Sequence, residues 1–270
     1  MKIIITLSGH SKRFTDEGYP EKQLVNILGK RVIEHVVNMF SSLYDISDYH
    51  FILKNDDNES ADLLQKIYQS PNIHYIPSHA KGPCHSILEC DFHFQENEEI
   101  IVSYCDIEVK WDIHTFVNYC RASDSDGVVV THVGFHPHRL YNKSFAFIKS
   151  KGRQILGIQE KIPYTDNIFN EHASSGIYYF KSFKSMVHYF NKTIEAKDVV
   201  KGEFYVTLPY NHMIKDNKKI TLYEVDNFFS FGTPQDIELI DAWNTIHTKA
   251  NINNDHELHQ SSRYWRRFLG

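Results

Sequence analysis

Residues 3–14 read Ile-Ile-Ile-Thr-Leu-Ser-Gly-His-Ser-Lys-Arg-Phe, and this stretch decides the fold. The β-branched apolar run 3–7 is typical of a strand buried on both faces of a parallel sheet. Ser8 and Gly9 follow at once, and small residues here let the backbone turn sharply and bring its N–H groups to a ligand. From Lys30 onward, apolar residues at helical spacing predict a helix. Strand, loop and helix together predict the first unit of an α/β domain.

Two cations accompany this loop. Arg13 lies beside it, and Lys22 follows in the segment Tyr19–Leu24. Arginine binds phosphate bidentately and lysine binds it as a point charge, so the pattern predicts a polyphosphate site. The loop is not a Walker loop, because no G-K-[ST] follows the glycine at the required spacing. It is not the dinucleotide fingerprint G-x-G-x-x-G either.

The stretch resembles the N-terminal signature of the sugar-phosphate nucleotidyltransferases, or nucleoside-diphosphate-sugar pyrophosphorylases. Their pattern is a strand, (L/M)-A-G-x-G-x-R-F, a glycine-tyrosine turn, P-K-x-L, then G-K and a helix. The residues in register are Leu7, Gly9, Arg13, Phe14, Gly18, Tyr19, Lys22, Leu24, Gly29 and Lys30. Ser8 replaces the alanine and Ser11 the second glycine, so the turn is kept if the φ of Ser11 is negative. The resemblance implies a nucleotide-binding loop made of Leu7, Ser8, Gly9, His10 and Ser11.

The composition of the chain limits the class of protein and the kinds of partner that it can bind. The 270 residues are 41% hydrophobic and 23% charged, which is ordinary for one large globular α/β domain. A net charge of −5 gives no electrostatic footprint for nucleic acid. No apolar run approaches the roughly 20 residues that span a membrane, and no signal-peptide pattern opens the chain. We therefore expect no nucleic-acid or membrane partner.

Cysteine and histidine usage points to a cytoplasmic protein without a zinc site. The four cysteines contain no C-x-x-C pair and fit reduced, partly buried thiols: Cys84, Cys90, Cys105 and Cys120. Of the 17 histidines, His136 and His138 are the closest pair, and Pro137 between them prevents a shared helical face. We interpret the histidines as mostly surface and hydrogen-bonding residues.

The first half continues as alternating strands and helices, which predicts βαβ crossovers and a parallel sheet. We expect strands at 49–53, 73–76, 99–104 and 127–131 and helices at 61–68 and 112–121. Gly82 matches the glycine-led loop that recognises the base in the resembled family, whereas Pro83 and Cys84 match no common version of it. A plain helix start with proline in its first turn explains the same residues.

An acidic segment, Cys105-Asp106-Ile107-Glu108, follows the strand at 99–104. Ligands of open α/β sheets bind beyond the carboxyl ends of the strands, and carboxylates are ligands that Mg²⁺ prefers. Asp106 lies where the resembled family carries its metal-binding aspartate. Glu108 points to the same side if the strand geometry persists for two residues. Mg²⁺ is therefore the expected cofactor, with Cys105 beside the nucleotide.

The second half alternates in polarity at 144–149 and 154–159, which predicts antiparallel strands. It also resembles the family's sugar-binding portion in four ordered motifs, so that the resemblance covers about residues 2–245. These are the E-K step at Glu160-Lys161, A-S-x-G-x-Y-x-F at 173–180, the acidic-aromatic segment at 202–206, and G-T-P-x-D at 232–236. The substrate-binding residues that it implies are Glu160, Lys161, Ser175, Gly176, Glu203, Tyr205 and Gly232.

One acid of the family pattern is missing. Many members carry a second metal-binding aspartate two residues before the glycine of G-T-P, where this chain has Ser230. Asp226 is nearby and is the fallback second ligand. Some capsule-associated members also lack that acid, and the chain resembles these capsule or surface-polysaccharide relatives most.

Residues 249–270 lie outside the resemblance. The segment 251–255 reads as a linker, and the aromatic-basic run 264–268 either packs back on the domain, which we prefer, or meets a partner subunit. A homo-oligomer therefore stays open.

These observations predict an α/β fold with a mostly parallel central sheet and helices on both faces, like nucleotide-diphospho-sugar transferases of the GT-A type. A small antiparallel subsheet should come from the second half. We expect one domain at 1–248, divided into a nucleotide-binding half (1–133) and a sugar-phosphate-binding half (134–248), followed by the tail at 249–270.

The expected reaction joins a nucleoside triphosphate to a phosphorylated acceptor, a sugar 1-phosphate by resemblance, and releases pyrophosphate. Arg13 is assigned to the triphosphate, Lys22 to the α-phosphate, Asp106 to Mg²⁺ and Lys161 to the acceptor phosphate. Two alternatives stay open. A glycosyltransferase would use residues 106–108 as a D-x-D-like clamp, and a non-catalytic nucleotide-binding homologue would explain Ser11, Pro83 and Ser230.

Overall fold

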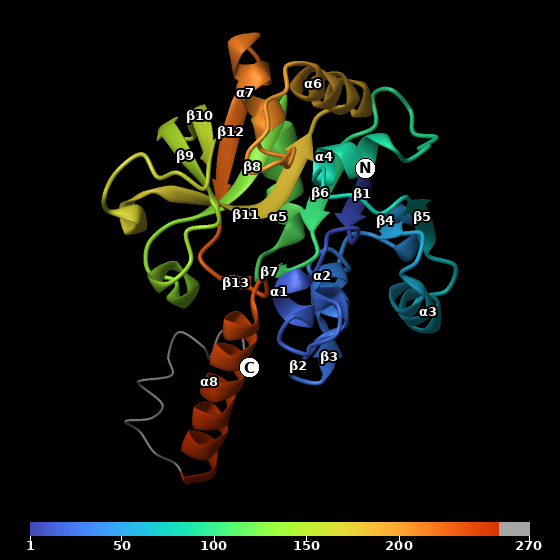
Figure 1. Cartoon of the computed structure of the whole chain (residues 1–270). Helices are drawn as coiled ribbons and strands as arrows, with labels where there is room; N and C mark the ends of the chain where they lie inside the picture. The colour runs from blue at the N-terminus through green and yellow to red at the C-terminus, as the bar shows by residue number, and fades with distance from the viewer. Residues whose placement is uncertain (254–270) are drawn as a thin grey trace.

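The chain is an α/β domain built on a central sheet of nine strands (Figure 1). The structure is a computed structural model that describes residues 1–253 and the side chains of residues 1–249. The strands are β1 (Lys2–Thr6), β2 (Asn26–Ile27), β3 (Lys30–Arg31), β4 (Tyr49–Lys54), β5 (Asn72–Ile76), β6 (Ile100–Tyr104), β7 (Ile107–Val109), β8 (Gly127–His132), β9 (Ala146–Lys151), β10 (Gln154–Glu160), β11 (His172–Phe180), β12 (Ile220–Glu224) and β13 (Phe228–Ser230). The α-helices are α1 (Lys12–Thr15), α2 (Val32–Asn38), α3 (Asn58–Ile67), α4 (Pro83–Leu88), α5 (Ile113–Ala122), α6 (Phe183–Glu195), α7 (Leu208–Lys215) and α8 (Pro234–Asn253).

The sheet is mixed, and its order is β5-β4-β1-β6-β11-β8-β12-β10-β9. β5, β4, β1 and β6 are parallel to one another, as the crossovers of the first half predict. β11 enters antiparallel between β6 and β8, and β12 is parallel to β8. The predicted antiparallel strands of the second half form the β9–β10 hairpin, which extends the same sheet at its far edge. The predicted fold is confirmed.

Helices cover both faces of the sheet, each over its own core. On one face, α2, α3 and α5 pack on alternate residues such as Ile3, Ile5 and Val128. On the other face, α4, α6 and α7 pack on the intervening residues such as Ile4 and Val129. Successive side chains of a strand point to opposite faces, so strands buried on both faces need the continuous apolar runs seen in the sequence.

Two small antiparallel sheets lie at the lower end of the domain in Figure 1, where β1 and β6 end. One is the β2–β3 hairpin, and the other pairs β13 with β7. A third apolar cluster joins this region to α8, with Phe14, Ile27, Phe231 and Ile240 among its buried residues. The loops at the carboxyl ends of the strands are therefore held on a packed base.

The C-terminal part departs from the sequence-based expectation in one respect. The predicted linker at 251–255 begins inside α8, which continues to Asn253, so that prediction is wrong for residues 251–253. The expected packing of the aromatic-basic run at 264–268 lies outside the described residues. Among the described residues, none of the helices combines the length and the apolar character needed to cross a membrane.

Candidate active site

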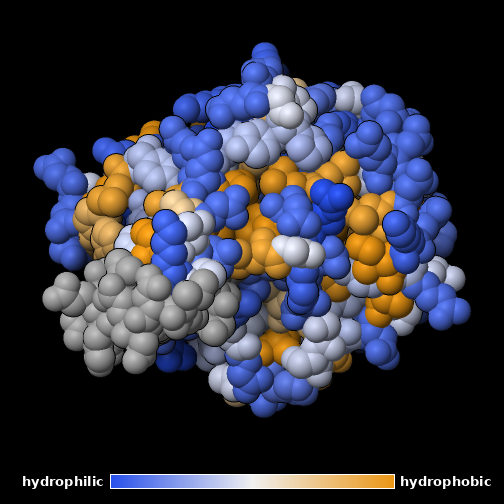
Figure 2. All heavy atoms as spheres, turned by 90° about the horizontal axis from the view of Figure 1, so that it is seen from below, coloured by the Kyte–Doolittle hydropathy of each residue, from blue (hydrophilic) through white to orange (hydrophobic). Residues whose placement is uncertain are grey.

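A cavity of about 670 Å³ opens where β1 and β6 end. Seen from below the view of Figure 1, apolar surface lies in the middle of this side, between hydrophilic side chains (Figure 2). The cavity is lined by nearly all the residues that the sequence assigned to the site, from both halves of the chain. These are Ser8, Gly9, His10, Ser11, Arg13, Lys22, Gly82, Cys105, Asp106, Glu160, Lys161, Ser175, Gly176, Glu203, Tyr205 and Gly232. Leu7 and Asp226 are not among the lining residues: Leu7 is fully buried in the core beneath the loop.

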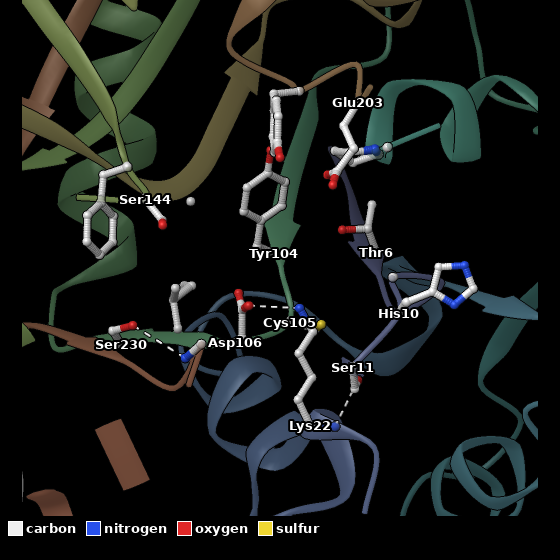
Figure 3. Close-up of a pocket in the computed structure, with 18 of the residues that line it drawn as sticks. Thr6, His10, Ser11, Lys22, Tyr104, Cys105, Asp106, Ser144, Glu203 and Ser230 are labelled. Carbon is white, nitrogen blue, oxygen red and sulfur yellow. Dashed lines mark hydrogen bonds and ion pairs between the residues drawn. The ribbon is translucent and has the colours of Figure 1, made fainter. Parts of the chain in front are cut away.

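The signature loop keeps its turn despite Ser11. Ser11 has φ −79°, so the position needs no glycine, and its side chain accepts a hydrogen bond from the backbone N–H of Lys22 at 3.0 Å. Glu21, the residue before Lys22, accepts a hydrogen bond from Lys54 Nζ at the end of β4 at 2.7 Å. The serine that departs from the family pattern therefore connects the loop to Lys22 (Figure 3).

Lys22 and Asp106 form an ion pair across the floor of the cavity (Figure 3). Lys22 Nζ donates to Asp106 Oδ2 at 2.8 Å, and each side chain is 20% exposed. Burial opposes the charge on Lys22, but the carboxylate of Asp106, together with Cys105, outweighs it and raises the pKa of the ammonium. Lys22 therefore stays charged at neutral pH, and its charge is directed at Asp106.

Glu108 does not join Asp106, so the expectation that both acids point to one side is wrong. Glu108 lies in β7, is 4% exposed, and contacts His35 Nδ1 at 3.0 Å and Lys110 Nζ at 2.6 Å. A bend separates β6 from β7, and β7 pairs with β13 rather than continuing the central sheet. The alternation of β6 therefore ends before Glu108.

Ser230 lies beside Asp106, in the position of the missing acid (Figure 3). A side chain added at Gly232 would have its Cβ 3.5 Å from Ser230 Oγ and 3.6 Å from Asp106 Oδ2, so glycine keeps the space between them open. Ser230 Oγ donates to Asp236 Oδ2 at 3.0 Å, and burial raises the pKa of that carboxyl. Asp226, the fallback ligand, does not line the cavity. Its negative charge partly opposes the burial that lowers the pKa of His136.

Gly82 allows a close approach that no other residue permits. Its φ is +89°, and an added Cβ would lie 2.7 Å from the backbone nitrogen of Phe204. α4 begins at the next residue, with Pro83 in its first turn. The glycine thus joins the loop before α4 to the segment that carries Glu203 and Tyr205, and it brings the two halves of the cavity wall together.

The opposite wall carries Glu160 and Lys161 at the end of β10. Glu160 is 7% exposed and accepts a hydrogen bond from Thr207. Burial raises the pKa of Glu160 to about 7, although Thr207 and Lys161 act in the opposite direction. Burial also lowers the pKa of Lys161, whose ammonium donates to the Tyr205 hydroxyl and lies 4.3 Å from the centre of its ring.

The backbone is irregular at two points of this wall. Lys161 has φ +62°, a conformation that costs a non-glycine residue energy and is found at functional sites. β11 bulges between Ser174 and Tyr178, with Gly176 at φ +78°. The bulge places Ser175 on the cavity, where its hydroxyl lies 3.1 Å from Nδ1 of the buried His132.

Sequence reasoning missed a further set of lining residues. They come from strands, loops and helix α4, and the sequence assigned none of them to the site, because their contact with the cavity arises from folding. They include Thr6, His79, Ser86, Tyr104, Asn142, Ser144, Phe145, Tyr178 and Phe228. Several are aromatic, which gives the second-half wall a largely apolar surface between its few polar groups.

A known protein family matches more than half of this chain. The model of the family described as "MobA-like NTP transferase domain" matches residues 3–156. The sequence matches none of the curated proteins with which it was compared.

Many solved structures share the fold, and three of them are described here. A nucleoside-diphosphate-sugar pyrophosphorylase from Vibrio cholerae RC9 superposes with a TM-score of 0.68 at 20% identity, over 87% of this chain and 97% of that one. A proposed glucose-1-phosphate thymidylyltransferase from Bacillus anthracis gives 0.70 at 21% identity, over 90% and 94%. An inositol-1-phosphate CTP transferase from T. maritima gives 0.63 at 9% identity, over 100% and 97%.

Proposed function

This chain belongs to the MobA-like NTP transferase domain family, and from that premise we propose that it transfers a nucleoside monophosphate to a phosphorylated acceptor, a sugar 1-phosphate. The products are an NDP-sugar and pyrophosphate. The observation that carries the proposal is one cavity with the cationic signature loop on one side and the Glu160–Lys161 wall on the other. The similar proteins named above act on different acceptors and nucleotides, so the acceptor and the base need direct measurement.

The reaction needs no nucleophile from the protein. A phosphate oxygen of the acceptor attacks the α-phosphorus, a new P–O bond forms, and the bond to the β-phosphate breaks so that pyrophosphate leaves. Positioning and charge neutralisation supply the catalysis. Arg13 binds the triphosphate and the leaving pyrophosphate, and Lys22 neutralises charge that develops at the α-phosphate. The backbone of the signature loop, residues 8–11, cradles the nucleotide.

The acceptor lies against the second-half wall in this proposal. Lys161 holds the acceptor phosphate, and its lowered pKa comes from burial that a phosphate dianion would offset. Glu160 and Glu203 face sugar hydroxyls, while Ser175, Tyr205 and the backbone around Gly232 complete the wall.

The donor set fits Mg²⁺ held mainly by one carboxylate. Asp106 offers a hard oxygen beside Ser230 Oγ, and Mg²⁺ at phosphate-transfer sites binds through one or two carboxylates with waters and substrate oxygens. When bound, the ion supplies positive charge to the phosphates. Asp106 is paired with Lys22, so Lys22 would turn to the nucleotide when Asp106 takes a new partner.

The glycosyltransferase alternative is weakened by the placement of Glu108, since a D-x-D-like clamp needs two acids on one cavity. The experiment that decides among the three functions is incubation with each nucleoside triphosphate, Mg²⁺ and a panel of sugar phosphates. Pyrophosphate release that depends on both substrates supports the proposal. Glycosyl transfer from an NDP-sugar, or nucleotide binding without turnover, contradicts it. Capsule or surface-polysaccharide synthesis is the proposed context, tested by whether the preferred sugar occurs in the source cell's surface polymer.

A further inference from the structure

We propose that His79, His85 and Glu89 form a binding site for a transition-metal ion such as Zn²⁺, separate from Asp106. His79 lies in the loop after β5, His85 is in α4, and Glu89 caps the end of that helix. Among the described residues, this is the one group of three or more histidine, cysteine or acidic side chains whose ligand atoms all lie within 4.8 Å of one another. His85 and Glu89 are four residues apart and share a helix face.

The spacing of the ligand atoms suits a tetrahedral ion. Zn²⁺ binds nitrogen and oxygen ligands at roughly 2.0–2.1 Å, which places neighbouring ligand atoms about 3.3 Å apart. Here His85 Nδ1 lies 3.0 Å from Glu89 Oε1, and His79 Nε2 lies 3.6 Å from Glu89 Oε2. The two imidazole centroids are 4.8 Å apart. Both oxygens of one carboxylate therefore already face the two rings.

The site is enclosed but reachable. The side chains of His79, His85 and Glu89 are 10%, 20% and 28% exposed. Three protein ligands leave a fourth tetrahedral position for water or another molecule.

Metal binding has a structural consequence at Lys81. The backbone N–H of Lys81 donates to His79 Nδ1 at 3.1 Å, so the ring proton of a neutral His79 is on Nε2. An ion on Nε2 moves that proton to Nδ1, which breaks the bond to Lys81. The Lys81 ammonium, 3.2 Å from His85 Nε2, must also move away. Both changes fall directly before Gly82.

This consequence reaches the nucleotide side of the cavity. His79 and Ser86 line the cavity, and Ser8 Oγ of the signature loop donates to Ser86 Oγ at 2.9 Å. Ser86 Oγ is in turn 3.5 Å from His79 Nε2. An ion at the site is thus one hydrogen-bonded residue away from the loop, and we expect it to change the apparent affinity for the nucleotide.

Another histidine cluster does not meet the same criterion. The rings of His132, His136 and His138 lie 4.7–5.7 Å apart and are buried around Phe228. Their nitrogens do not form a group within 4.8 Å in the described part of the chain. Closely packed rings therefore do not by themselves make a metal site, and convergence of the ligand atoms distinguishes the first cluster.

The test is calorimetric titration of the metal-free protein with Zn²⁺, without nucleotide or acceptor. We expect one ion per chain in the wild type. His85→Ala and Glu89→Gln should each weaken binding on the order of 100-fold, whereas His93→Ala, at a histidine whose side chain is 88% exposed and outside the cluster, should leave it unchanged. Thermal melts without metal check that all variants fold, and a Zn²⁺-dependent rise in Tm should disappear with the first two variants.

The proposal is overturned if the wild type binds no Zn²⁺, or if all four proteins bind it alike. The effect on the nucleotide rests on the proposed function and is measured separately, as the change in nucleotide KM that Zn²⁺ causes in the wild type but not in His85→Ala. If no combination of substrates releases pyrophosphate, the proposed function fails while the titration still decides the metal site.

Discussion

On the side of the cavity proposed for the nucleotide, Lys22 Nζ and Asp106 Oδ2 form an ion pair at 2.8 Å. On the opposite wall, Glu160 and Lys161 are adjacent in sequence but bond Thr207 and Tyr205, and burial shifts both pKa values toward the neutral forms. The Lys22–Asp106 pair thus offers charged groups that a substrate can bind in place of the present partner. The charges of Glu160 and Lys161 depend instead on the ligand that lies beside them. This difference suits a polyanionic donor on the first side and a smaller acceptor on the second.

Asp106→Asn should have the largest effect, because the amide keeps the shape of the side chain and removes the negative charge opposite Lys22. We expect turnover to fall on the order of 1,000-fold, equivalent to about 4 kcal/mol of transition-state stabilisation. The rate of pyrophosphate release at saturating concentrations of both substrates measures this fall in turnover. Asp226→Asn is the matched control and should stay within about twofold, since Asp226 does not line the cavity. An Asp106→Asn protein with most of its activity would remove Asp106 from the reaction.

Arg13→Ala should lower turnover by a factor on the order of 100, the cost of one lost contact in the transition state. Folding should be nearly unchanged, because Arg13 is exposed. Arg153→Ala removes another exposed arginine, which lies over the Tyr119 ring and away from the cavity, and should leave turnover unchanged. Equal pyrophosphate release by both variants would show that the signature loop does not act through its arginine.

Lys161→Ala should affect binding of the acceptor at the wall that carries Glu160 and Lys161. We expect the acceptor KM to rise, or kcat to fall, by roughly tenfold, the loss of one charged contact of about 1.4 kcal/mol. Nucleotide affinity should change by no more than a few-fold. Calorimetry with the nucleotide and with the acceptor separates the two. Lost nucleotide binding with normal acceptor binding would mean that the two sides are assigned in reverse.

The two sides also differ in how far the sequence predicts them. On the nucleotide side, the strand, the loop, Arg13 and Lys22 lie within about 20 residues, so a local pattern carries both the fold and the chemistry. Glu108 was placed incorrectly because the pairing of β7 with β13 joins segments more than 100 residues apart, which strand alternation does not contain. On the acceptor side, the E-K step indicated Glu160 and Lys161, but Asn142, Ser144 and Phe228 meet there only through tertiary folding.

Ser230→Asp tests whether the missing acid matters. A carboxylate at this position lies next to Asp106 and should tighten Mg²⁺ binding several-fold, with kcat changed less than about threefold. Because Ser230 Oγ lies 3.0 Å from Asp236 Oδ2, the new charge also meets a buried carboxyl, so the variant should be less stable. Ser230→Asn, similar in size and uncharged, is the control for both measurements. Unchanged Mg²⁺ affinity would show that this position does not reach the ion.

Glu160→Gln should have the smallest effect on turnover and a clear effect on the pH dependence of stability. The folded-state pKa of Glu160 is about 7, above its unfolded value near 4.5, because burial disfavours the carboxylate. The folded protein therefore binds more protons than the unfolded chain between these values, and its stability falls as pH rises through that range. Replacing the carboxyl with an amide removes this loss.

The measurement is the free energy of unfolding of wild type and Glu160→Gln at pH 5, 6, 7 and 8. The difference should shift in favour of the variant by roughly 1–3 kcal/mol between pH 5 and pH 8. Glu238→Gln, at an exposed position of α8, controls for the loss of one carboxylate. A saturating acceptor should reduce the shift if its phosphate draws a charged Lys161 beside Glu160, because that cation stabilises the carboxylate. A pH profile identical in all three proteins would mean that Glu160 is charged in the folded state, and the contrast between the two sides of the cavity would then be lost.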